Sequence, residues 1–200
     1  HRDLHSFPTR RSSDLCAPII KFVPEGNIEP PSGAMLFPGS ISLRAETYHM
    51  LLDDIASSLK QSGFKNIIFI GDSGGNQKGM EIVAKKLNQR WSGSGVLAHY
   101  IPEYYNPGWE ETERFTKEVL GVEETSNDGH HDDIWVTAMM MVTDPEQVRH
   151  QQRIDAGLAS INGVDITPIG ETIELGRKML EFRAEFTADA ILKAIQSSKQ

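Results

Sequence analysis

The stretch that decides the fold is Asn66-Ile67-Ile68-Phe69-Ile70-Gly71-Asp72-Ser73-Gly74-Gly75-Asn76. Residues 66–70 form an apolar run that is too short for a helix and is typical of a parallel strand covered on both faces. The glycine-rich residues 71–76 predict a tight turn. Beyond it, the apolar residues from Met80 to Leu87 recur at helical spacing. Strand, turn and helix in this order predict an α/β fold.

The rest of the chain continues this alternation. The expected elements are a buried strand at 17–23, a loop at 24–39, a helix over 51–59 ending at Gly63, a strand at 96–101, a loop at 102–109, short helices over 110–120 and from 145, an apolar segment at 137–142, a turn at 162–165 and a long helix from about 171. One face of that last helix is expected to hold Ile173, Gly176, Leu180, Ala184, Thr187, Ile191 and Ile195. Strands that alternate with helices predict a mostly parallel sheet covered by helices.

The composition excludes several classes of function. The chain has 200 residues, which suits one domain, and 38% apolar residues, which suffice for a core. Its net charge is -8 without a Lys/Arg cluster, so we expect no nucleic-acid partner. The single cysteine, Cys16, excludes an intramolecular disulfide and a cysteine-based zinc site. No apolar run reaches the ~20 residues of a membrane span, so we expect no membrane partner.

The first fifteen residues differ from the rest. Residues 1–15 are polar, basic and without periodicity, and they lack the apolar stretch of a secretion signal. The segment 7–15 resembles a translated sequencing adapter, so we expect 1–15 to be a non-native or disordered leader before a single domain at 16–200. The natural N-terminus is then missing, and the compartment stays open between the cytoplasm, as the default, and the periplasm.

The turn at 71–76 is the first candidate site, because ligands of open α/β sheets bind beyond the carboxyl ends of strands. Glycines let a backbone approach a ligand, and a helix start offers free N–H groups and partial positive charge. Three interpretations stay open. Ser73 or Asn76 is only a helix cap; or Ser73 is a nucleophile in a G-x-S-x-G turn, with His131 as its base and a carboxylate as orienter; or the loop belongs to a metal-dependent hydrolase with altered ligands.

Several segments, in their order and spacing, resemble the creatininase family. The matching segments are Phe37 to Leu43 with Glu46-Thr47, Gly63-Phe64, Ile67 to Asn76, and then Asp144-Pro145, Val148-Arg149 and Gly157. Family members carry "G-T-I-S-L", "N-G-H-G-G-N" and "D-P-x-x-V-R…G" at these places. The resemblance runs from about residue 16 to 198.

The resemblance implies a three-layer α/β/α domain and a homo-oligomer, often a hexamer. It also implies hydrolysis of cyclic or linear amides, a small-molecule substrate and two divalent metals, usually zinc or manganese. Such metals lower the pKa of a bridging water and polarise the amide carbonyl. The residues expected to contact substrate are Gly74, Gly75, Asn76, Tyr105 and Trp109.

The chain departs from the family pattern in its ligands. Ser73 stands where the loop histidine is expected, and Asp72 replaces a glycine. The second motif, "D-G-H-A-G-E-x-E-T-S", places its histidine on His130 or His131, depending on the register, beside Asp132 and Asp133. The expected metal ligands are Asp72, His130, His131 and Asp132, and the expected catalytic residues are His131, Ser73 and Asp133. The alternative from another class is a non-catalytic binding or assembly module that kept the fold and lost the metals.

Overall fold

The protein is described from a computed structural model, which covers residues 15–126 and 133–198. The helices are α1 (Ala45–Gln61), α2 (Gly74–Arg90), α3 (Gly108–Glu118), α4 (Ile134–Thr143), α5 (His150–Asp155) and α6 (Ile169–Ser197). The strands are β1 (Asn66–Phe69), β2 (Leu97–Tyr100), β3 (Ser160–Ile161) and β4 (Val164–Asp165), and short 3-10 helices occur at η1 (Gly33–Leu36), η2 (Pro102–Tyr104) and η3 (Pro145–Val148). Within the described ranges, no helix is long and apolar enough to cross a membrane.

The sheet region comprises α1, β1, α2 and β2. β1 and β2 pair in parallel, with Asn66 opposite Leu97 and Phe69 opposite Tyr100, and α2 connects them. The predicted helical stripe of α2 is confirmed, because it packs into a core shared with α1 and both strands. That core consists of Tyr48, Leu52, Ala56, Ile67, Phe69, Met80, Val83, Ala84, Leu87, Trp91, Val96 and Ala98. One apolar cluster therefore fixes the direction of β1 and the start of α2.

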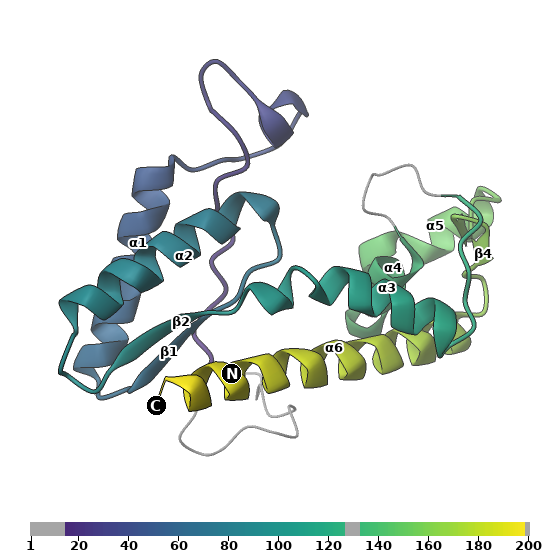
Figure 1. The fold of residues 1–200 in the computed structure, drawn as a ribbon. Coiled ribbons are helices and arrows are strands. Elements are labelled where there is room, and N and C mark those ends of the chain that lie inside the picture. The colour runs from purple at the N-terminus through teal and green to yellow at the C-terminus, as the bar shows by residue number, and fades with distance from the viewer. Residues whose placement is uncertain (1–14, 127–132, 199–200) are drawn as a thin grey trace.

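The helical region comprises α3, α4, α5, the β3–β4 hairpin and most of α6 (Figure 1). Figure 1 shows it at one end of the molecule and the sheet region at the other, with α6 running between them. α4 and α6 pack closely at Gly176, where a Cβ would overlap the carbonyl oxygen of Ala138. Trp135, Ala138 and Met179 form the buried cluster at this contact.

The buried face of α6 differs from the predicted one. Its buried residues are Thr172, Gly176, Met179, Arg183 and Thr187. Gly176 and Thr187 were expected there, but Leu180 is 38% exposed and Ala184 is also exposed. The two faces have similar spacings of three and four residues, but the buried face has Thr172, Met179 and Arg183 where their C-terminal neighbours were expected. Both faces contain Gly176, where α4 approaches closely, and apolar character alone does not decide which side of this glycine is buried. The corrected face contains an arginine.

The predicted strand at 17–23 is wrong. Ile20 and Val23 pack against the core of the sheet region, but Ile19 is 86% exposed and Phe22 is 52% exposed. Among the described residues the segment forms no strand and pairs with neither sheet; its apolar side chains reach the core one at a time, without the backbone ladder that a strand needs. The α/β class holds for the described chain. The three-layer arrangement stays a prediction.

Candidate active site

The loop at the end of β1 leads directly into α2. Ser73 is the N-cap residue, with extended φ and ψ of -130° and 140°, and its Oγ accepts a hydrogen bond from the backbone N–H of Gly75 at 3.3 Å. The capping interpretation therefore describes part of what Ser73 does. The same hydroxyl donates to Glu25 Oε1 at 2.8 Å, so its proton is directed to a carboxylate and not to a histidine ring.

The segment that carries Glu25 lies against the glycines of the loop. A Cβ at Gly75 would overlap the carbonyl oxygen of Pro24, so only glycine allows this approach. Gly74 faces a different neighbour, because a Cβ there would lie 3.2 Å from the hydroxyl oxygen of Tyr105. Both glycines were predicted to contact substrate. Gly75 instead allows close packing against Pro24, and Gly74 lies beside Tyr105, another predicted substrate contact.

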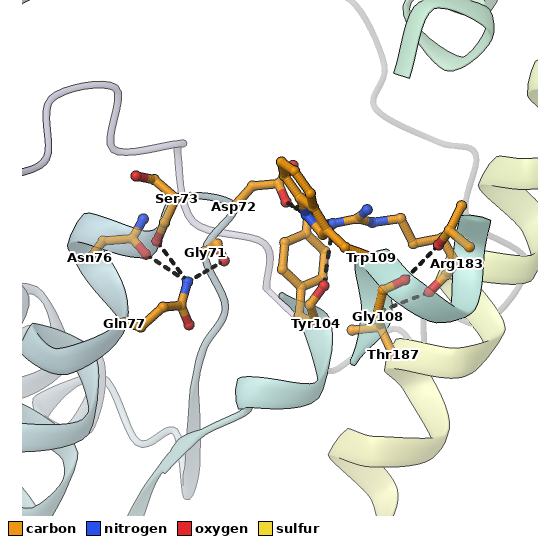
Figure 2. Close-up of polar contacts among 11 residues, drawn as sticks. Gly71, Asp72, Ser73, Asn76, Gln77, Tyr104, Gly108, Trp109, Arg183 and Thr187 are labelled. Atoms are coloured by element: carbon orange, nitrogen blue, oxygen red, sulfur yellow. Dashed lines mark hydrogen bonds and ion pairs between the residues drawn. The ribbon is translucent and has the colours of Figure 1, made fainter. Parts of the chain in front are cut away.

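Gln77 holds the backbone of this loop. Its Nε2 donates to Gly71 O and Ser73 O, both at 2.8 Å, and to Asn76 Oδ1 at 2.9 Å (Figure 2). Tyr100 completes the arrangement by donating its hydroxyl to Gln77 Oε1 at 2.9 Å. Asn76, a predicted substrate contact, is 6% exposed and faces the loop backbone. Gln77 was not predicted, although it directly follows the glycine-rich turn.

Asp72 is the residue on which distant elements converge. Its Oδ1 accepts hydrogen bonds from Trp109 Nε1 of α3 and from Arg183 Nη2 of α6, both at 2.7 Å (Figure 2). The side chain of Asp72 is 53% exposed, whereas that of Arg183 is 7% exposed. The contact therefore joins a half-exposed carboxylate of the sheet region to a buried guanidinium of the helical region.

The surroundings of Arg183 are mainly aromatic. Its guanidinium carbon lies 4.7 Å from the ring centroid of Tyr104 and 5.4 Å from that of Trp135, and Nη2 also donates to Tyr104 O at 3.2 Å. Arg183 Nη1 is buried and has no hydrogen-bond partner among the described residues. Burial, and secondarily the charge of Asp72, raises the pKa of the Tyr104 phenol against the opposing effect of Arg183.

The rings next to Asp72 form a connected series. Tyr105 and Trp109 have centroids 5.3 Å apart, and Trp109 meets Trp135 edge to face at 5.2 Å. Tyr105 and Trp109 were predicted to contact substrate, and the structure places both next to the loop. Arg183 was not predicted. The available signal was its spacing, because it lies seven residues after Gly176 and four before Thr187.

The acidic and histidine-rich segment lies partly outside the described residues. His130, His131 and Asp132 lie outside the described residues. Asp133 is the N-cap residue of α4, and its backbone carbonyl accepts from Thr137 N–H at 3.0 Å. Next to it, Glu124 Oε1 accepts hydrogen bonds from Ile134 N and Asn162 Nδ2, both at 2.8 Å. Burial raises the pKa of Glu124, partly opposed by these two donors.

The donor set at the loop does not fit a divalent metal by itself. Residues 15–126 and 133–198 contain no group of three or more His, Cys, Asp or Glu side chains placed to hold a metal ion. At the loop, Oδ1 of Asp72 already accepts hydrogen bonds from Arg183 and Trp109. The hydroxyl of Ser73 is a poor ligand for zinc, and it donates to Glu25. The zinc or manganese site implied by the resemblance is therefore not formed by these side chains.

A strand, a glycine-rich turn and a helix that bring a carboxylate to the end of a parallel strand define an α/β protein with a candidate site at a strand terminus. Comparison with known families is more specific: the family model described as "Creatininase: Creatinine amidohydrolase" matches residues 9–191. The chain belongs to the creatininase family. No curated protein and no solved structure matches it. At family level this supports an amidohydrolase-type function on a small molecule, in a family whose members generally depend on metals.

Proposed function

We propose that the chain hydrolyses a C–N bond of a small amide at the loop after β1. The observation that carries this proposal is the convergence of Asp72, Trp109 and Arg183, which come from three different elements, at the carboxyl end of a parallel strand. Membership of an amidohydrolase family gives the reaction class. In the reaction, water adds to the amide carbonyl carbon, the C–N bond breaks, and the amine leaves with a proton while the acyl group becomes a carboxylate.

Asp72 is assigned to substrate binding through its second oxygen. Both observed hydrogen bonds end on Oδ1, and the described part of the chain gives Oδ2 no donor. A half-exposed carboxylate oxygen held in a fixed direction is a good acceptor for an amide N–H. The rings of Tyr105 and Trp109 would lie against the apolar part of the substrate. Gly74 leaves room for the Tyr105 hydroxyl.

Proton transfer is assigned to the acidic and histidine-rich segment. A histidine near its ordinary pKa suits general acid–base work at neutral pH, and His131 with Asp133 keeps this role as a prediction. Zinc or manganese also stays a prediction, with its ligands to be sought mainly among His130, His131 and Asp132. A homo-oligomer, and a hexamer in particular, belongs to the same set of family-based proposals.

The test is turnover of a panel of small cyclic and linear amides, followed as release of ammonia or amine. We expect Asp72→Ala to lower kcat/KM by about 100-fold, because a positioned polar contact to the reacting group is lost. Asp53→Ala is the matched control, since Asp53 on α1 also pairs with an arginine, Arg90 at the C-terminal end of α2, away from the loop. Turnover that survives Asp72→Ala unchanged contradicts the assigned site.

A second candidate function is a binding module without catalysis. The observation in its favour is that Ser73, at the place of the expected ligand histidine, is engaged by Glu25 and by the N–H of Gly75. Saturable binding of an amide by the metal-loaded protein, with no turnover, would support this candidate. The serine-nucleophile alternative is tested by an activated phosphonate, and the lack of an adduct on Ser73 at saturating reagent would exclude it.

A further inference from the structure

The side chain of Arg183 on α6 is held firmly next to the loop. Its side chain is 7% exposed, it lies between the rings of Tyr104 and Trp135, and one of its nitrogens binds both Asp72 and a backbone carbonyl. Moving a guanidinium out of such a place breaks two hydrogen bonds and two ring contacts at once. The positive charge next to Asp72 is thus a permanent part of the site.

A divalent metal at Asp72 would have to share that carboxylate with this charge. The guanidinium nitrogen of Arg183 is 2.7 Å from Oδ1 of Asp72. A metal bound to Oδ2 would therefore be separated from this cation only by the carboxylate group. Like charges at this separation repel strongly when one of them is buried. The neutral indole of Trp109 also donates to Oδ1, so both lone pairs of this oxygen are used and it has none left for a metal.

We infer that the guanidinium of Arg183 is the resident cation of this loop, and that Asp72 is a hydrogen-bond acceptor held by it and not a ligand of a divalent metal. This departs from the metal-ligand role predicted for Asp72 from the sequence. It deepens the proposed function, since it rests on the same site and names Arg183 as the positioning residue of the central carboxylate. Its test does not need turnover, so an inactive protein leaves the inference open to measurement.

The first measurement is titration of the metal-free full chain with zinc chloride by calorimetry. Asp72→Asn is expected to keep the zinc stoichiometry of the wild type and its affinity within twofold, because any metal bound by the chain uses other ligands. Asp53→Asn controls for the loss of one carboxylate that pairs with an arginine. A zinc affinity that falls tenfold or more in Asp72→Asn, but not in Asp53→Asn, overturns the inference.

The second measurement tests whether Arg183 fixes Asp72. The indole Nε1–H of Trp109 donates to the same oxygen, so its NMR signal reports the position of the carboxylate. The chain has three tryptophans, which makes assignment by Trp→Phe variants direct. Arg183→Met is expected to shift the Trp109 signal, and Arg183→Lys, which keeps the charge, to restore at least half of that shift.

The two outcomes are independent of the activity assay. An unchanged Trp109 signal in Arg183→Met, or equal shifts in the Met and Lys variants, contradicts the positioning role. Where the buried Arg183→Met change prevents folding, the comparison of Arg183→Lys with the wild type and the zinc titration of Asp72→Asn still decide. Asp72 is half exposed, so its isosteric replacement by Asn tests the inference in a folded chain.

Discussion

The sheet region and the helical region are stabilised in different ways. The sheet region has one continuous apolar core that includes residues of α1, β1, α2 and β2. The helical region divides its apolar core between a cluster under the hairpin and one at the α4–α6 contact, and it buries Arg183 among aromatic rings. The comparison indicates that the two regions have different roles. The sheet region fixes the position of the loop, and the helical region supplies Trp109 and Arg183, which hold the Asp72 carboxylate.

The largest effect is expected from Leu87→Ala in the core of the sheet region. Leu87 is fully buried on α2, so its truncation should lower the free energy of unfolding by about 2–5 kcal/mol through lost transfer energy and a cavity. Leu180→Ala on α6 is the matched control, because this leucine is 38% exposed and its truncation should cost less than about 1 kcal/mol. Equal losses in urea unfolding would contradict the expected difference between the buried Leu87 and the exposed Leu180.

A smaller effect is expected from Asp72→Asn. The change leaves a buried guanidinium without its carboxylate, which should lower the free energy of unfolding by about 1–3 kcal/mol, a value reduced by the solvent exposure of Asp72. Asp53→Asn removes the carboxylate of a pair whose Arg90 side chain is 51% exposed, and should cost less than about 1 kcal/mol. The same unfolding assay measures both, and a reversed order would contradict the importance of burial at Arg183.

The smallest effect concerns the pH dependence of Glu124. Burial raises the pKa of this carboxyl in the folded state, so the folded chain binds more protons than the unfolded chain just above the ordinary pKa of 4.5. Its contribution to stability is fully present below that pH and is lost as the pH rises through the raised value. Glu124→Gln keeps the acceptor for Ile134 N and removes the titration, so the difference in unfolding free energy between variant and wild type should increase over this window. A difference that is constant with pH would contradict the shift.

The sequence predicts the sheet region better than the site. Its strand, turn and helix lie close together in the chain, and a local apolar run with a helical stripe is enough to identify them. The prediction of a strand at 17–23 was wrong, because an apolar segment becomes a strand only when its backbone pairs with a neighbouring strand. Arg183 was missed because the face of α6 was predicted mainly from apolar residues, which placed Ala184 on it instead, and because its partner Asp72 lies 111 residues away. Tyr105 and Trp109, predicted to contact substrate, do lie next to the loop. The roles of His130, His131 and Asp132 stay predictions.

The separation between Asp72 and Arg183 also has a consequence for biosynthesis. Asp72 leaves the ribosome 111 residues before Arg183, and the last strand of the sheet region, β2, ends at Tyr100, well before Arg183. Closing a loop of this length costs conformational entropy, and chains generally form nearby contacts first. Until α6 has been synthesised and packed, the carboxylate of Asp72 therefore stays in contact with water and has no ion pair with Arg183. A nascent chain that stops before α6 has the sheet region but not the assembled site.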